Sequence, residues 1–130
     1  MKASTKSGFW LACSGLVGAT GVLAGAFGAH GLKNLLSPEM LEVWNTAVHY
    51  HLLHAPALLG VALALHIMGD KRGIRVAGWC FLVGVVVFSG SLYLLAVTGF
   101  RLLGAVTPIG GLALVAGWMS LFFSGLRLSP

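Results

Sequence analysis

Four stretches of this sequence contain no Asp, Glu, Lys or Arg, and each is long enough to cross a membrane. They cover residues 9–29, 46–68, 76–100 and 102–126. An α-helix needs roughly 20 apolar residues to cross about 30 Å of hydrocarbon, and it closes its backbone hydrogen bonds within its own segment. We therefore expect an all-α polytopic membrane protein, in which residues 1–130 form a single domain of four transmembrane helices in an up-down-up-down bundle.

The composition excludes an ordinary water-soluble domain. Hydrophobic residues make up 58% of the 130 residues and charged residues only 8%, whereas globular proteins have about 25% charged residues. The net charge is +5, but no basic run carries interleaved aromatic residues, so we expect no nucleic-acid partner. The lipid bilayer is the natural partner of such a surface, and excess basic charge in a membrane protein favours anionic headgroups.

Basic residues are distributed unevenly between the segments that join the spans. Six lie at the two ends of the chain or between the second and third spans: Lys2, Lys6, Lys71, Arg72, Arg75 and Arg127. The other connections contain Lys33, Arg101, Glu39 and Glu42. The positive-inside rule then places both termini in the cytoplasm of a bacterial inner membrane, or in the matrix for a mitochondrial protein. On this topology the inner interface should contain Trp10, Trp79 and Trp118, and the outer one Trp44.

The connection between the first two spans contains signals for a helix start. Ser37 is a typical N-cap, Pro38 suits the first helical position, and Glu39 suits the first turn. We expect a short interfacial helix that begins here and leads into the second span. One helix over this whole length would measure about 46 Å, so it must tilt, bend or lie partly along the surface. Pro56 supplies a bend, because without its N–H the carbonyl of Leu52 loses its helical partner.

Small side chains recur along the first and fourth spans at intervals of three and four residues. The first seam is Ser14, Gly18, Gly21, Gly25 and Gly28, and the second seam is Gly110, Ala113, Gly117, Ser120 and Ser124. Lipid gives no hydrophobic drive for helix association, so close approach at small residues is what holds such helices together. We expect both seams to pack, either against each other or against a partner protein. The alternative is that glycine is simply common in membrane helices.

Three of the five histidines stand in the stretch HYHLLHAP near the start of the second span. On the expected topology, polar residues of all four helices meet in the outer leaflet. This polar cluster comprises His30, Tyr50, His51, His54, Ser89, Ser91, Tyr93 and Thr107. His51 and His54 are about 60° apart around a helix, whereas His49 points away from them. We therefore expect His51 and His54 to point inward, toward hydroxyls of the third span or the carbonyl that Pro56 leaves free.

Three interpretations of the polar cluster compete. The one we favour is a hydrogen-bond network that ties the helices together, because buried polar groups need partners. The second is a ligand site for a metal, haem or quinone, where His30, His51 and His54 could bind a metal with Glu39 or Glu42 nearby. The third is a path for protons or small solutes, which is weakened because no acidic residue lies within a span. We expect no bound metal or cofactor.

Four motifs carry a resemblance to a known family. They are GAFGAHGLK at 25–33, WNTAVHYHLLHAPALL at 44–59, FSGSLYLLAVTG at 88–99 and GAVTPIGGLALVAGW at 104–118, in order along nearly the whole chain. Together they resemble the domain-of-unknown-function 423 family of small integral membrane proteins of bacteria, which has relatives in mitochondria. The resemblance implies a four-helix inner-membrane protein and brings no agreed activity.

The sequence gives no support for an enzyme. It has no nucleophile with a base in context, no carboxylate pair in a pocket and no phosphate-binding loop. We expect a protein that works by association: an accessory, assembly or stabilising subunit of a larger membrane complex, or a homo-oligomer. The alternative is a carrier of a cofactor or small ligand, or a relay for protons or solutes, in the outer half of the bundle.

Overall fold

The computed structural model describes residues 5–129, most of which lie in four long helices. Helix α1 spans Thr5–Phe27 and continues as the short π-helix η1 (Gly28–Leu32). It is followed by α2 (Pro38–Met68), α3 (Arg72–Thr98) and α4 (Leu103–Leu128). No β-strand occurs within residues 5–129. The expected all-α fold is confirmed, and each of the four helices is long and apolar enough to cross a membrane.

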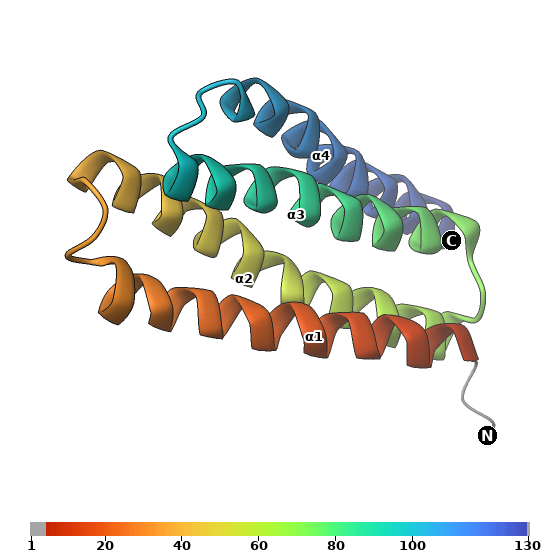
Figure 1. Ribbon diagram of the computed structural model, residues 1–130. Coiled ribbons are helices and arrows are strands. Elements are labelled where there is room, and N and C mark those ends of the chain that lie inside the picture. Colours follow the sequence, from red (N-terminus) through yellow and green to blue (C-terminus); the bar gives the residue numbers. More distant parts are fainter. Residues whose placement is uncertain (1–4, 130) are drawn as a thin grey trace.

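The helices pack in chain order, α1 on α2, α2 on α3 and α3 on α4, and consecutive helices run in opposite directions (Figure 1). In the described residues, α1 and α4 make no extensive contact with each other. They are therefore less covered than the central pair, with 17% of the apolar window buried in α1 and α4 against 33% in α2 and α3. The result is an open row of helices. That successive helices cross a membrane in alternating directions stays a prediction.

The start of α2 follows the signals in the sequence. The Ser37 hydroxyl accepts a hydrogen bond from the backbone N–H of Met40 at 3.2 Å, and Pro38 occupies the first helical position. The helix then runs for 31 residues without interruption, with Pro56 inside it. The expected interfacial helix is thus the first part of α2 and not an element of its own.

The first helix continues beyond the last residue of the expected first span. Instead of stopping at residue 29, the chain continues to Leu32 in the wider π-helix η1. The indole of Trp44 lies beside this turn and donates a hydrogen bond to the carbonyl of Ala24 at 2.9 Å. A Cβ on Gly28 would lie 2.6 Å from the indole, so only glycine leaves room for Trp44 against this helix.

The first seam packs against α2 along its whole length. Its members are Ser14, Gly18, Gly21, Gly25 and Gly28. The Ser14 hydroxyl donates to the carbonyl of Ala55 at 2.9 Å. A Cβ on Gly21 would lie 2.7 Å from Leu52 Cδ2, which is closer than two carbon atoms can approach. The missing side chains therefore let α1 and α2 lie close together.

The second seam packs against α3. Its members are Gly110, Ala113, Gly117, Ser120 and Ser124, of which Ala113 is half-buried. Gly110 faces the backbone of Phe88, and a Cβ on Gly117 would lie 2.6 Å from the Phe81 ring. The Ser120 hydroxyl donates to the carbonyl of Gly73 at 2.8 Å. Each seam thus packs against a neighbouring helix of the same chain, and the two seams do not face each other.

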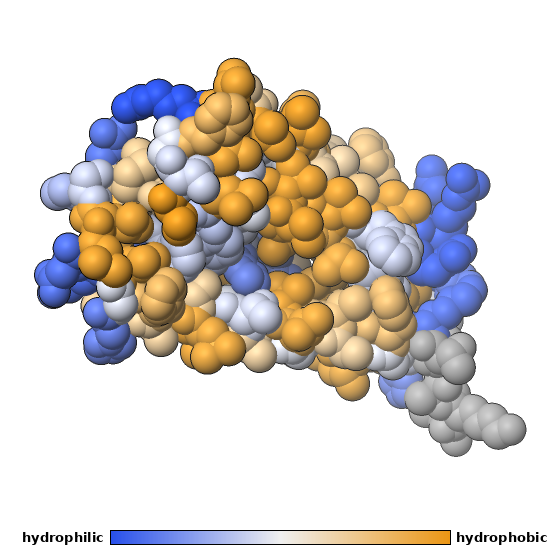
Figure 2. Space-filling view, viewed as in Figure 1, coloured by the Kyte–Doolittle hydropathy of each residue, from blue (hydrophilic) through white to orange (hydrophobic). Residues whose placement is uncertain are grey.

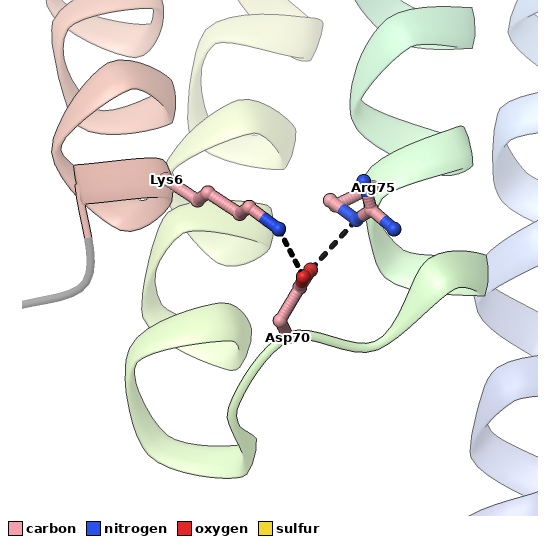
Figure 3. A network of polar contacts seen from close by, with 3 residues as sticks. All are labelled: Lys6, Asp70 and Arg75. Atoms are coloured by element: carbon pink, nitrogen blue, oxygen red, sulfur yellow. Dashed lines mark hydrogen bonds and ion pairs between the residues drawn. The ribbon is translucent and has the colours of Figure 1, made fainter.

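An ion-pair network joins the starts of α1 and α3 through the loop after α2 (Figure 3). The Lys6 ammonium donates a hydrogen bond to the Asp70 carboxylate, and Arg75 Nε lies 2.6 Å from Asp70 Oδ1. The hydrogen bond from Lys6 is the main cause that lowers the pKa of Asp70 below its ordinary value of 3.8, and the charge of Arg75 adds to it while desolvation opposes. Sequence reasoning gave Asp70 no role, because Lys6 lies 64 residues before it in the chain.

The close packing of the second seam can be tested by adding one methyl group to it. Gly110→Ala should lower the free energy of unfolding in detergent micelles by about 1–3 kcal/mol, the usual cost of overpacking, because the new Cβ would overlap the backbone of Phe88. Gly60→Ala is the matched control, since nothing lies within 4 Å of its added Cβ. The control should be neutral or slightly stabilising because alanine favours helix. Equal effects of the two substitutions on the unfolding midpoint would contradict the seam.

The ion-pair network predicts an acid-dependent part of the stability. Because the pKa of Asp70 is lowered in the folded protein, its contribution is complete above the ordinary value of 3.8 and is lost as the pH falls through the lower folded value. Unfolding midpoints measured in a non-ionic detergent should therefore fall at acidic pH, and Asp70→Asn should flatten this part of the curve. Glu42→Gln removes an exposed carboxylate that has no ion pair among the described residues and should leave the curve unchanged. Identical curves for the two variants would exclude the network.

Candidate functional site: a histidine network on α2

His54, near the middle of α2, is 2% exposed and has both ring nitrogens hydrogen-bonded. Its Nδ1 lies 2.7 Å from the carbonyl oxygen of Tyr50. The indole N–H of Trp118 donates to its Nε2 over 3.1 Å. An indole N–H only donates and a carbonyl only accepts, so Nδ1 carries the proton and the imidazole is neutral. His54 therefore ties α2 to α4.

His51 lies one turn earlier on α2 and connects three helices. Its Nε2 is 3.1 Å from the Thr20 hydroxyl on α1, and its Nδ1 is 2.9 Å from the Tyr93 hydroxyl on α3. The Thr20 hydroxyl donates its own proton to the carbonyl of Leu16 at 2.8 Å, so its oxygen accepts from Nε2–H. Tyr93 then donates to Nδ1. With Tyr93 as this donor, His51 is neutral and in the opposite tautomer to His54.

Two serines extend the network to the backbone of α2 and to α4. The Ser89 hydroxyl, which is 1% exposed, donates to the carbonyl of Ala47 at 2.8 Å. The hydroxyls of Ser91 and Thr107 lie 2.6 Å apart and join α3 to α4. Of the expected polar cluster, the structure therefore brings these three residues into one helix-bridging set with His51, His54 and Tyr93.

Two expected members of the polar cluster lie outside it. His30 is exposed on η1. Tyr50 is 38% exposed, and its ring lies against Phe88 with 4.5 Å between ring centroids. Only the backbone carbonyl of Tyr50 joins the network, through His54. His49 is exposed, which is the orientation that its angular position predicts.

The carbonyl that Pro56 leaves free, one of the expected partners of the histidines, is not used by His54. The imidazole of His54 bonds the carbonyl of Tyr50, four residues earlier, and not the carbonyl of Leu52 that Pro56 leaves free. Side chains on a helix tilt toward its N-terminus, so a ring reaches the carbonyl one turn earlier on its own face. Leu52 is only two residues away, and its side chain packs instead against Gly21 of α1.

Two residues of the network were missed from the sequence. Trp118 was expected at the inner interface, but its N–H bonds His54 and its ring lies 4.9 Å from that of Phe81 between centroids. Thr20 was not considered at all. Both residues are immediate neighbours of a seam glycine, Gly117 and Gly21. A polar side chain beside such a glycine is the signal that could have found them, because the close helix contact puts it within reach of the next helix.

A groove of about 370 Å³ lies between α1 and α3, with His51 and Tyr93 among its lining residues. Its other lining residues are mostly apolar. The ring nitrogens of His51 are already bonded to Thr20 and Tyr93, so a ligand here would have to displace one of these bonds. In residues 5–129, no group of three or more His, Cys, Asp or Glu residues is close enough to hold a metal ion. The proposed metal set of His30, His51 and His54 is not assembled, since His30 lies elsewhere.

Comparison with known proteins identifies relatives along most of the chain. The sequence model of a family described as "Protein of unknown function (DUF423)" matches residues 24–111. The UPF0382 membrane protein YwdK of Bacillus subtilis is 42% identical over 103 residues, which cover 79% of this chain and 84% of the relative. A UPF0382 membrane protein of Staphylococcus haemolyticus is 50% identical over 104 residues, which cover 79% of this chain and 83% of the relative. No solved structure matches the chain.

The relatives extend beyond one bacterial group. A UPF0382 membrane protein of Haemophilus influenzae is 37% identical over 106 residues, covering 82% of this chain and 84% of the relative. The four apolar helices and these relatives define a small membrane protein. The chain belongs to the DUF423 family, as its four motifs indicated. The family description names no activity, so the function has to be argued from the network itself.

The bond between Trp118 and His54 can be tested by removing the indole N–H. Trp118→Phe should lower the free energy of unfolding by about 1–3 kcal/mol, because the buried Nε2 of His54 loses its donor. Trp79→Phe makes the same change in a ring of similar exposure, 52% against 46% for Trp118, that packs on Phe9 and Trp10. It should cost less because it removes no donor from a buried histidine. In a His54→Ala background the effect of Trp118→Phe should shrink, since the interaction is already gone. An unchanged effect in that background would show that the bond contributes nothing.

Proposed function

We propose that the protein works by association in the membrane, as a non-enzymatic accessory, assembly or stabilising subunit of a larger complex, or as a homo-oligomer. The observation that carries this proposal is the state of the two buried histidines. All four of their ring nitrogens are bonded to groups of the chain itself. A metal ion or other ligand at either ring would have to displace one of these four bonds. The network therefore fits a structural role, in which its hydrogen bonds hold the helices together.

The outer surface of the helix row supports the proposal. Figure 2 shows apolar residues over the middle of the molecule and hydrophilic residues at its two ends. On α1, a Cβ added to Gly8 or Gly15 would meet nothing within 4 Å. Both glycines are exposed, and small residues on a membrane helix let a second helix approach closely. The outer face of α1 is the surface that we propose for association.

We also propose that the protein lies in a bacterial inner membrane with both termini in the cytoplasm. The start of α1, the loop between α2 and α3 and the end of α4 lie at one end of the molecule (Figure 1). Among the described residues, that end holds Lys6, Lys71, Arg72, Arg75 and Arg127. The opposite end holds Lys33 and Arg101. The excess of basic residues supports a cytoplasmic location for the first end.

A second candidate function is the binding of a small ligand in the groove between α1 and α3. The observation that favours it is the position of His51 and Tyr93 in the lining of that groove. An absorption spectrum and metal analysis of the purified protein test this candidate directly. A haem band or stoichiometric metal that disappears in His51→Ala would establish the ligand and would overturn the proposal of a ligand-free scaffold.

The association itself can be tested in mild detergent. Tagged protein at native expression levels should migrate well above its monomer mass of 13.5 kDa plus micelle, and crosslinking in intact membranes should give the same assembly. Gly15→Leu should break the assembly, because the bulky side chain blocks close approach to α1. Gly60→Leu is the matched control, since its Cβ also meets nothing within 4 Å but lies on α2. A monomer under all conditions, or equal effects of both variants, would refute association through α1.

A further inference from the structure

A hollow of about 200 Å³ lies where the first turn of α3 meets the last turns of α4. Its charged lining residues are Lys71, Arg72 and Arg127. It belongs to neither the histidine network nor the outer face of α1. Its position is at the end of the molecule that holds the start of α1, level with the ends of helices long and apolar enough to span a membrane (Figure 1).

The walls of this basic pocket are held by a close helix contact. The Ser120 hydroxyl donates to the carbonyl of Gly73 at 2.8 Å. A Cβ on Gly73 would meet the Ser124 hydroxyl, which would have to rotate away, so the two helices lie close together here. Arg127 lies one turn beyond Ser124 on α4. The contact therefore fixes the basic residues of α3 and α4 on two sides of one hollow.

The positive charge of the basic pocket has no acidic counterpart among residues 5–129. The chain has three acidic residues, and none of them lines the pocket. Asp70 is close in sequence but is held by Lys6 and Arg75 (Figure 3), whereas Glu39 and Glu42 lie in the first turns of α2 at the opposite end. In the described part of the chain, Lys71, Arg72 and Arg127 form no ion pair. This leaves three uncompensated cations around one hollow.

We propose that the basic pocket binds the phosphate of an anionic lipid headgroup. Basic side chains at a membrane surface attract anionic lipids, and basic pockets between transmembrane helices bind their headgroups. Ile74 and Leu128 also line the pocket, so an apolar chain attached to the phosphate has apolar neighbours. Inorganic phosphate has the same charge chemistry but lacks that chain. The proposal does not depend on the function proposed above.

Native mass spectrometry of the detergent-solubilised protein measures this binding. Phosphatidylglycerol should bind more tightly than phosphatidylcholine, whose headgroup has no net charge. Arg72→Gln with Arg127→Gln should weaken phosphatidylglycerol binding by about 5-fold for each charge removed, as expected for a basic side chain at an anionic surface. Lys33→Gln with Arg101→Gln removes the same charge from the opposite end and should leave the affinity unchanged.

Three outcomes would overturn the proposal. These are equal affinity for the two lipids, equal losses in the two double variants, and displacement of phosphatidylglycerol by inorganic phosphate that binds the protein as tightly. The last outcome would identify a site for a free anion. Helical circular dichroism checks that each variant is folded. Should the double variant fail to fold, Arg127→Gln alone should still weaken binding, and Arg127→Lys should retain it because the charge is kept.

Discussion

The hydrogen bonds of two neutral imidazoles on α2 determine how the four helices are arranged. His51 bonds α1 and α3, and His54 bonds α4, so one face of a single helix is joined to every other helix. Within a membrane no water can replace a lost partner, and a buried polar group without one costs about 1–3 kcal/mol or more. Each imidazole therefore favours the one arrangement of helices in which all its partners are present.

The glycine seams and the histidine network depend on each other. Gly21 brings α1 close to α2, and the neighbouring Thr20 then reaches His51. Gly117 brings α4 against Phe81 of α3, and the neighbouring Trp118 then reaches His54. Dispersion forces at the small residues supply much of the packing energy in lipid, while the directional hydrogen bonds select the rotation of each helix. The positions of Thr20 and Trp118 follow from both features together: each lies where a seam brings a partner within hydrogen-bonding distance.

The sequence was sufficient for features that depend on one helix at a time. The absence of charged residues predicted four long apolar helices, and Ser37 and Pro38 predicted the start of α2. The helical period predicted that His51 and His54 point inward and that His49 points outward. The sequence also predicted that the seams pack, but it did not predict most individual contacts between helices, including the Trp118–His54 bond and the pairing of Lys6 with Asp70. Tyr50 was misplaced because a closed bundle would cover its face, whereas the helices form an open row. His30 was misplaced because it was placed by its depth along the first span alone, whereas two residues after Gly28 it lies on roughly the opposite side of the helix from the first seam.

The central claim is that both buried histidines are neutral and fixed in opposite tautomers by their partners. Nitrogen-15 NMR of the imidazole rings, in protein labelled at histidine and assigned with His51→Ala and His54→Ala, measures this directly. At neutral pH the account predicts a proton on Nδ1 of His54 and on Nε2 of His51, with an acceptor-type shift for the other nitrogen of each ring. A charged ring, averaging between tautomers or the shift of a metal-bound nitrogen at either residue would contradict it.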